Sequence, residues 1–276
     1  MFLIDMHVHT DDSPDADIPA GELVVRGMEI NLAGIGFVAH VDLNPEDHCY
    51  GGFEESIYNQ SINLARKKSG RGLLVLKGIE VGEPHIYEEK VKSIVDYSSY
   101  DFITGALHSL QGIGMVLGKE VYAGADPLEI VEQYYIETLQ MVEEADMDIL
   151  AHMGLFRRGL ALAGLKHDIN ELKLWPDTIR RILETIIDRN IALELNTSGL
   201  RRKENITYPT PLILDLYHRI GGELITTGSD THREPHVFFG LEKGKKLLEE
   251  TGFKGSYFYR NRKPGRIPES ENLFPL

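Results

Sequence analysis

Short apolar runs alternate with longer amphipathic stretches along the whole chain. Regular alternation of this kind is typical of an α/β protein with a parallel sheet. A count of seven runs favours an incomplete or distorted barrel over the usual eight-stranded one, although an open, doubly wound sheet would give the same pattern. The predicted strands are Phe2–Asp5, Ile35–Ala39, Leu73–Ile79, Asp101–Gly105, Asp148–Ala151, Ile191–Leu195 and Glu223–Thr227.

The stretches between the predicted strands have the residue spacing of helices, as in Pro127 to Glu144 and Asp177 to Arg189. The first of these follows Asp126, an N-cap residue, and has proline at its first position. No linker, repeat or low-complexity tract divides the 276 residues, and 42% of them are hydrophobic. We therefore predict a single domain, 1–276, around one large core. The tail from Arg260 to Leu276, rich in Pro, Arg and Asn, is expected to lie over the surface.

Composition narrows the functional classes. The formal net charge is −14, from 43 acidic and 29 basic residues, which argues against a polymeric nucleic acid as partner. An acidic chain can still hold an anionic substrate where metal ions and a few arginines reverse the local field. A single cysteine, Cys49, and the absence of a signal peptide or a long apolar run predict a cytoplasmic protein without a membrane partner. The oligomeric state stays open.

Potential metal ligands stand at the ends of six of the seven predicted strands. In a parallel sheet or barrel these ends lie on one face, so we expect the side chains to meet there. The sixth strand ends instead in Glu-Leu-Asn-Thr-Ser-Gly, with Asn196. The ligand candidates, in strand order, are His7 with His9, His40, Glu80, His108, His152, and Asp230 with His232.

Imidazole and carboxylate groups together form the ligand set that zinc, manganese and iron accept. His7 and His9, two positions apart on an extended segment, point the same way. Each histidine alone could be an exposed or structural residue, but chance would have to place such residues at six strand ends. Eight ligands exceed what one ion holds, so we predict two or three divalent transition-metal ions (Mn, Fe or Zn). Glu80 is the candidate bridge, and such a cluster suits hydrolytic attack on phosphorus.

These residues lie in motifs that resemble those of the polymerase and histidinol phosphatase (PHP) superfamily, and within it the histidinol-phosphatase-like enzymes. The resemblance runs nearly end to end, and it implies a distorted (β/α)7 barrel with a trinuclear site at the C-terminal ends of the strands. The motifs, in the order of the family, are DMHVHTDDSPDAD, GIGFVAH, GIEVG, TGALHS, LAHMGLFRRG, LELNTSGLRR and TTGSDTH.

The resemblance also implies how the ligands are divided among the ions. One metal would take His7, His9, Glu80 and Asp230, and a second would share Glu80 and add His108 and His152. The third would take Asp15, His40 and His232, with Asp15 chosen by the S-x-D spacing of the family. The chain departs from the family at Ala39 and Gly154, where an aspartate that orients ligands is often found.

Two arginine pairs just past strand ends are candidates for binding phosphate, because guanidinium groups match phosphate oxygens two at a time. We select Arg157, Arg158 and Arg201 as substrate contacts. The predicted reaction is hydrolysis of a small phosphomonoester, most simply a histidinol-phosphate-like compound of histidine biosynthesis, by hydroxide held between two metals. Glu80, Asp230 and His232 are the candidate catalytic residues, the last two as donors of the leaving-group proton.

Two other readings remain open: a phosphodiesterase or nucleotidase acting on a small nucleotide, and a non-catalytic metal-binding protein. Comparing phosphate release from histidinol phosphate and from nucleotide esters distinguishes the predicted phosphatase from the first alternative. Absence of turnover with any phosphoester would support the second. His85 is expected to be an exposed residue at a helix start, with substrate contact as the alternative. Four histidines receive no role: His48, His167, His218 and His236.

Overall fold

Seven parallel strands form a nearly closed barrel in this computed structural model, which describes residues 3–115, 122 and 126–266. The prediction of a distorted seven-stranded α/β barrel is therefore confirmed. The strand order is β1-β2-β4-β5-β8-β9-β10, and the short β3 (His40–Val41) pairs with β4. The seven strands are β1 (Ile4–Val8), β2 (Gly34–Phe37), β4 (Leu74–Gly82), β5 (Phe102–Ala106), β8 (Ile149–Leu150), β9 (Ala192–Asn196) and β10 (Ile225–Gly228).

The barrel closes between the first strand and the segment that follows the last. Val8 forms an isolated parallel bridge with Thr231. The amide of Asp230 donates to the carbonyl of His7, and the amide of His9 donates to the carbonyl of Thr231, both at 2.9 Å. These bonds place the end of β1 beside the segment after β10, so candidate ligands separated by more than 200 residues become neighbours.

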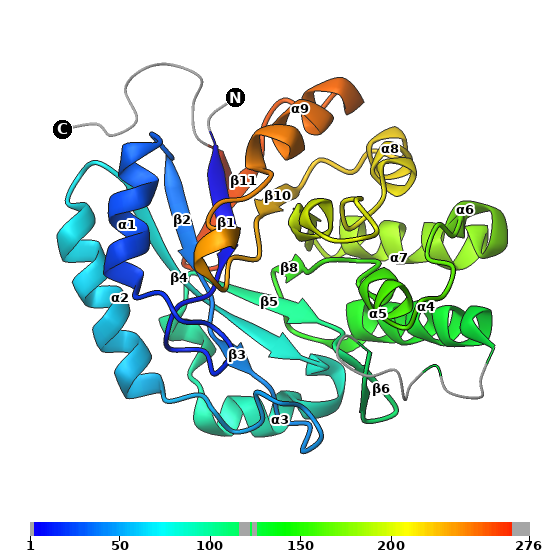
Figure 1. The fold of residues 1–276 in the computed structure, drawn as a ribbon, viewed down its shortest axis with the longest axis horizontal. Helices are drawn as coiled ribbons and strands as arrows, with labels where there is room; N and C mark the ends of the chain where they lie inside the picture. Colours follow the sequence, from blue (N-terminus) through cyan, green and yellow to red (C-terminus); the bar gives the residue numbers. More distant parts are fainter. Residues whose placement is uncertain (1–2, 116–121, 123–125, 267–276) are drawn as a thin grey trace.

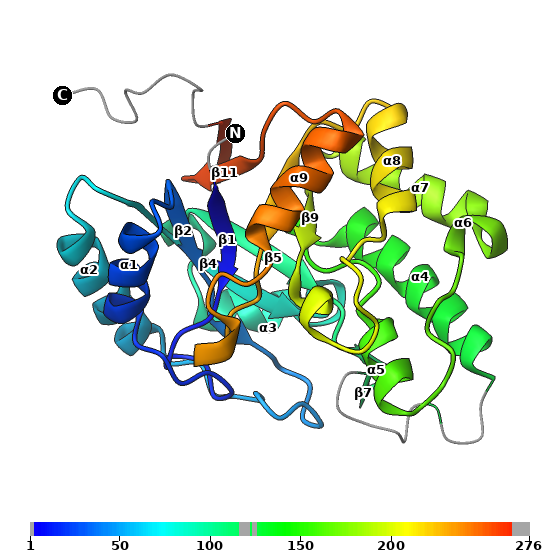
Figure 2. The ribbon, with the colours of Figure 1, turned by 45° about the horizontal axis from the view of Figure 1, so that its top comes forward.

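Helices surround the strands (Figure 1). α1 and α2 pack together against β2 and β4, while α7 and α9 cover β9 and β10 (Figure 2). The predicted helix from Pro127 is α4, with the predicted bounds, and the predicted Asp177–Arg189 helix begins and ends one residue earlier. Within the described residues, no helix combines the length and apolar character needed to cross a bilayer. The helices are α1 (Ala20–Glu29), α2 (Glu55–Ser69), α3 (Pro84–Ile94), α4 (Pro127–Glu144), α5 (Phe156–Leu162), α6 (Glu171–Leu174), α7 (Pro176–Asp188), α8 (Pro211–Arg219) and α9 (Leu241–Thr251).

The described residues form two apolar cores that support the barrel. The larger lies between strands and helices, whereas the smaller gathers side chains from β1, β4, β5, β8 and β9 and therefore fills the barrel interior. Phe102 belongs to the smaller core, and a Cβ at Gly78 would lie 2.3 Å from the Phe102 ring. This core fills the interior of the barrel below the C-terminal strand ends, where the sites of such barrels are built.

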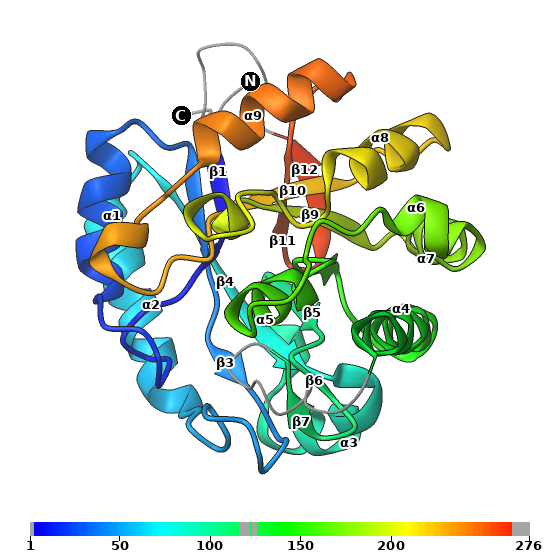
Figure 3. The same ribbon diagram turned by 45° about the vertical axis from the view of Figure 1, so that its right-hand side comes forward.

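A hairpin of β11 (Tyr257–Arg260) and β12 (Lys263–Arg266) closes the opposite end of the barrel, beside β9 and β10 (Figure 3). Tyr259 enters the inner core. Arg262 forms ion pairs with Asp146 and Asp148, which precede β8, and its amide donates to the carbonyl of Asp101, which precedes β5. The first part of the tail thus forms a strand pair that caps the barrel, and residues 267–276 lie outside the described part.

Candidate metal centre

The structure brings all nine predicted metal ligands to the C-terminal end of the barrel. Three of them lie within strands: His40 begins β3, and His7 and Glu80 are included because β1 extends to Val8 and β4 to Gly82, further than the sequence pattern predicted. The register of β1 against β2 shifts between Asp5 and Val8. Ile4 belongs to the inner core and Val8 to the outer one, although a regular strand would put both on one face. The irregularity therefore shifts the alternation of side chains along β1, so that His7 points toward the barrel axis.

Glu80 lies at the centre of the group, buried to 1% exposure. Its Oε1 atom faces His152 Nε2 at 2.8 Å and His108 Nε2 at 3.3 Å. Its Oε2 atom faces His9 Nε2 at 3.2 Å, and His7 Nε2 and His40 Nδ1 lie at 3.4 and 3.3 Å from it. Each carboxylate oxygen thus serves a different set of imidazoles, which is the arrangement that a bridging ligand requires.

The remaining candidates extend the group away from Glu80. Asp230 Oδ1 lies 3.2 Å from His232 Nδ1. Asp15 joins His232 and His40, with Oδ2 3.2 Å from His232 Nε2 and Oδ1 3.6 Å from His40 Nε2. His152 and Asp230 both have positive φ, at 26° and 56°, a backbone strain that concentrates at functional sites.

The electrostatics of the group favour added positive charge. Burial alone would raise the pKa of Glu80, but His7, His108 and His40 hold that pKa well below its usual range. Burial, together with His232 and His40, lowers the pKa of His9 to about 3, so this ring is neutral and keeps a lone pair. Burial lowers the pKa of His7 and of His108, but Glu80, with Glu194 beside His7 and Asp42 beside His108, raises both pKa values well above the usual range. The carboxylates therefore attract positive charge, which protons or bound metal ions can supply.

The donor atoms fit metal ions on geometry as well. His7 Nε2 and His9 Nε2 face each other at 3.1 Å, a contact that a shared cation between the lone pairs would satisfy. Asp15 Oδ1 is buried without a hydrogen-bond partner, and His40 Nδ1 makes no hydrogen bond but lies 3.0 Å from Asp42 Oδ2 and 3.3 Å from Glu80 Oε2. Triads with ligand atoms within 4.8 Å of one another include His7–His9–Asp230, His7–Glu80–His152, His40–Glu80–His108 and His9–His40–His232. Nitrogen and oxygen donors of this kind suit zinc, manganese and iron.

Two buried carboxylates that were not predicted from the sequence contact the Nδ1 atoms of two of these histidines. Glu194 Oε1 lies 2.8 Å from His7 Nδ1, and Asp42 Oδ1 lies 3.2 Å from His108 Nδ1. Their exposed fractions are 1% and 3%. A charged residue inside the apolar run of β9 was the available signal for Glu194, and the two-residue spacing after His40 was the signal for Asp42.

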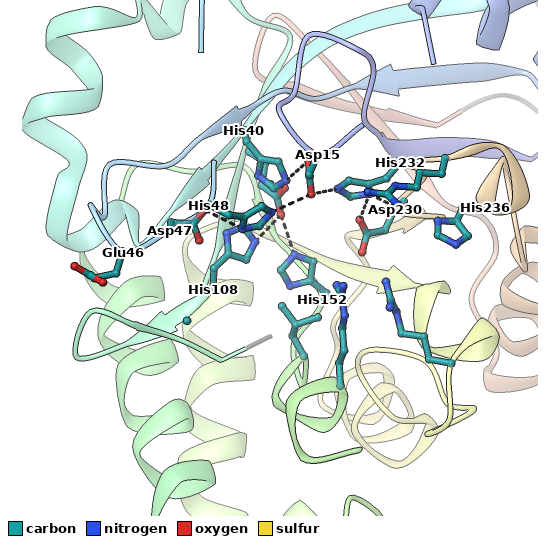
Figure 4. Close-up of a pocket in the computed structure, with 16 residues that line it drawn as sticks. Asp15, His40, Glu46, Asp47, His48, His108, His152, Asp230, His232 and His236 are labelled. Atoms are coloured by element: carbon teal, nitrogen blue, oxygen red, sulfur yellow. Dashed lines mark hydrogen bonds and ion pairs between the residues drawn. The ribbon is translucent and has the colours of Figure 1, made fainter. Parts of the chain in front are cut away.

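A cavity of about 440 Å³ opens over the group. Glu46, Asp47 and His48 line one side of it, and Asp230 and His236 lie on the other side of His108 and His152 (Figure 4). The wall also includes Arg158, Arg202 and Arg233. The cavity is therefore acidic at one edge and has arginines elsewhere along its wall.

Arg158 and Arg202 are poorly compensated cations. Burial, with Arg202 nearby, lowers the pKa of Arg158 to about 10. The Nε atoms of both side chains are buried without a hydrogen-bond partner. Two neighbouring guanidinium groups with free donors form a natural anion site.

Arg157 and Arg201, two of the three predicted substrate contacts, point elsewhere. Arg157 is buried to 1% exposure, with Nη2 2.5 Å from Glu171 Oε1 and 2.8 Å from the carbonyl of Ile169. Arg201 donates to the carbonyls of Ser229 and Asp230 at 2.6 and 2.7 Å. Neither lines the cavity. We therefore leave both out of the proposed substrate contacts, because neither side chain lines the cavity and each has donors bound to groups of the fold.

Three other histidines differ from their predicted surroundings. The side chain of His85 is buried to 1% exposure near Glu137 of α4, rather than exposed at the start of α3. His48 and His236, which received no role, both line the cavity. His48 Nε2 also lies 3.4 Å from Asp15 Oδ2. The local sequence around these residues contained no sign of the loops that fold over the centre.

Residues 5–198 match the family model described as the PHP domain. The chain belongs to this family. A probable histidinol-phosphatase of Clostridium acetobutylicum is 30% identical over 258 residues, which cover 93% of this chain and 97% of that protein. The histidinol-phosphatase of Lactococcus lactis subsp. lactis is 22% identical over 264 residues, 92% of this chain and 93% of that protein. The predicted membership of the PHP superfamily, in its histidinol-phosphatase-like branch, is confirmed.

The fold is shared with solved structures. Histidinol phosphate phosphatase from Lactococcus lactis, complexed with Zn, L-histidinol and phosphate, superposes with a TM-score of 0.84 at 20% identity, covering 96% of this chain and 99% of that one. A putative histidinol phosphatase from Listeria monocytogenes gives a TM-score of 0.74 at 22% identity, covering 87% and 99%. The predicted class of enzyme, a metal-dependent phosphatase, is the class of these homologues.

Proposed function

We propose that this chain, acting as one domain, is a metal-dependent phosphatase that hydrolyses a small phosphomonoester of the histidinol-phosphate type. The observation that carries the proposal is the position of Glu80, whose two oxygens face two different sets of histidines. The cavity above Glu80 lies over the packed core of the barrel, on the side where the predicted metal ligands converge.

The metal ligands proposed from the sequence are retained. His7, His9, Glu80 and Asp230 would hold one divalent ion, Glu80, His108 and His152 a second, and Asp15, His40 and His232 a third. Bound Mn, Fe or Zn would lower the pKa of water and neutralise charge on phosphoryl oxygens.

The protein side chains would orient the substrate. Arg158 and Arg202 would bind non-bridging phosphate oxygens through their unpartnered donors, as charge-assisted hydrogen bonds that strengthen when charge builds up on phosphorus. Asp230 or His232 would supply the proton for the leaving oxygen, since Asp230 Oδ1 and His232 Nδ1 face each other beside the cavity. Glu46 and Asp47, at the other edge, would face a cationic group of the substrate.

The proposal is tested with purified protein by metal analysis and a phosphoester screen. We expect at least two transition-metal ions per chain and phosphate release from L-histidinol phosphate well above release from adenosine monophosphate or a phosphodiester. The double variant His7→Ala/His9→Ala should lose turnover while remaining folded. Unchanged turnover in this variant, or a preference for the nucleotide or the diester, would contradict the proposal.

A further inference from the structure

We propose that two buried carboxylates, Asp42 and Glu194, divide the metal centre into two halves whose ions bind separably. Asp42 would orient the half that contains His40 and His108, and Glu194 the half that contains His7. The inference rests on the proposed metal centre and adds two positioning residues to it, neither of which is among the predicted ligands.

Asp42 contacts histidines from two different segments at once. Its Oδ2 lies 3.0 Å from His40 Nδ1, and its Oδ1 lies 3.2 Å from His108 Nδ1. His40 comes from β3 and His108 follows β5. Both rings then have their other nitrogen, Nε2, directed toward the centre: that of His108 lies 3.3 Å from Glu80 Oε1 and that of His40 lies 3.6 Å from Asp15 Oδ1.

The barrel makes room for this carboxylate. A Cβ at Gly82, the last residue of β4, would lie 2.0 Å from Asp42 Oδ1. Any side chain at this position would push Asp42 away from both rings. The glycine two residues after Glu80 is therefore linked to Asp42 by packing, and Asp42 contacts His40 in a chain that has alanine at position 39.

Glu194 repeats the construction on the opposite side of the barrel. Its Oε1 lies 2.8 Å from His7 Nδ1, and its Oε2 accepts from the amide of His152 at 2.7 Å. A Cβ at Gly228, in the neighbouring strand β10, would lie 2.1 Å from Glu194 Oε1. Each carboxylate thus occupies a space left by a glycine and holds the Nδ1 side of a ring whose Nε2 faces Glu80 or Asp15.

The physical consequence follows from imidazole chemistry. A carboxylate at Nδ1 selects the tautomer with the lone pair on Nε2, fixes the ring plane and raises the basicity of the ligand nitrogen. Loss of such a partner typically costs about 10–100-fold in metal affinity. Because Asp42 and Glu194 serve different rings, losing one should weaken one half of the centre and spare the other.

The test compares Asp42→Asn and Glu194→Gln with wild type by elemental analysis during stepwise dialysis against a chelator, and by anomalous diffraction from crystals of each variant. Asp96→Asn, which removes a carboxylate that caps a helical turn before β5, is the charge control and should match wild type. We expect Asp42→Asn to release the ions at His40 and His108 at a chelator concentration about 10–100-fold lower. Glu194→Gln should instead release the ion at His7 first.

Gly82→Ala provides an independent arm that keeps the Asp42 carboxylate in the chain but displaces it. It should reproduce the selective loss seen with Asp42→Asn, with circular dichroism confirming that the barrel is folded. Release of all ions together in both carboxylate variants, or unchanged metal retention in both, overturns the inference while a metal-loaded wild type leaves the proposed function standing. A wild-type protein that binds no transition metal overturns both.

Discussion

Oε1 of Glu80 lies 2.8 Å from Nε2 of His152, although 72 positions separate the two residues in the chain. The contact spans two strands of the barrel, β4 and the end of β8, with β5 between them. The other oxygen of Glu80 faces His9. One carboxylate therefore connects ligands from both ends of the first 152 residues, and its loss should affect more than one ion.

Replacing Glu80 by glutamine tests this connection. An amide keeps the size of the side chain but cannot bridge two cations with two anionic oxygens. We expect kcat to fall by more than about 100-fold, the upper end of what outer-shell changes cost, together with loss of more than one metal ion per chain. Phosphate release and elemental analysis measure the two effects. Loss of a single ion, with the rest retained, would show that Glu80 does not bridge.

The adjacent residues Arg157 and Arg158 should behave in opposite ways. Arg158→Ala should lower kcat/KM by about 10–100-fold, because one charge-assisted hydrogen bond to phosphate is lost, with little change in melting temperature. Arg157→Met should leave Glu171 buried without its ion-pair partner and lower the free energy of unfolding by about 3–5 kcal/mol. Steady-state kinetics and chemical denaturation of both variants measure the two effects. A large loss of stability in Arg158→Ala would assign this residue to the fold instead.

The acidic edge of the cavity predicts a preference for substrates with an ammonium group. In Glu46→Gln/Asp47→Asn, kcat/KM for L-histidinol phosphate should fall by about 10-fold, since the contact with a cationic amine weakens. The imidazolylpropyl phosphate that lacks the amine is the matched control and should change by less than about twofold, because the phosphate contacts are the same. Equal decreases in kcat/KM for the two compounds would mean that Glu46 and Asp47 affect the metal centre rather than the amine.

The hairpin at the far end of the barrel predicts a pH-dependent contribution to stability. Hydrogen bonding to Arg262 lowers the pKa of Asp146, while burial raises the pKa of Asp148 against the effect of Arg262. Arg262 favours the charged form of both carboxylates, so its contribution is present at neutral pH and lost as they protonate. Arg262→Met should therefore lower the free energy of unfolding by about 2 kcal/mol at neutral pH.

This difference between wild type and Arg262→Met should shrink as the pH falls toward about 3, where the carboxyl groups bind protons. Urea denaturation at a series of pH values measures it, and kcat of the folded variant should equal that of wild type. A difference that grows toward acid pH would contradict the assigned sign.

Local pattern was enough to predict the seven strands, the helix from Pro127 to Glu144, and the residues that meet at the C-terminal ends of the strands. Each of these depends on short-range information, because an apolar run buries itself as a strand and parallel strands must end on one face. Even where the bounds were wrong, as for His7 and Glu80, the strand only extended further and carried the same residue to the same end of the barrel.

Only the tertiary structure decided which side chains act together. Arg157 and Arg158 are neighbours in sequence, yet one is turned inward by Glu171 and the other lines the cavity. Asp42 reaches His108 because Gly82, at the end of β4, leaves space for it. Orientation and burial of this kind depend on partners far along the chain, and the free energy of burying a charge is set by those partners rather than by its sequence neighbours.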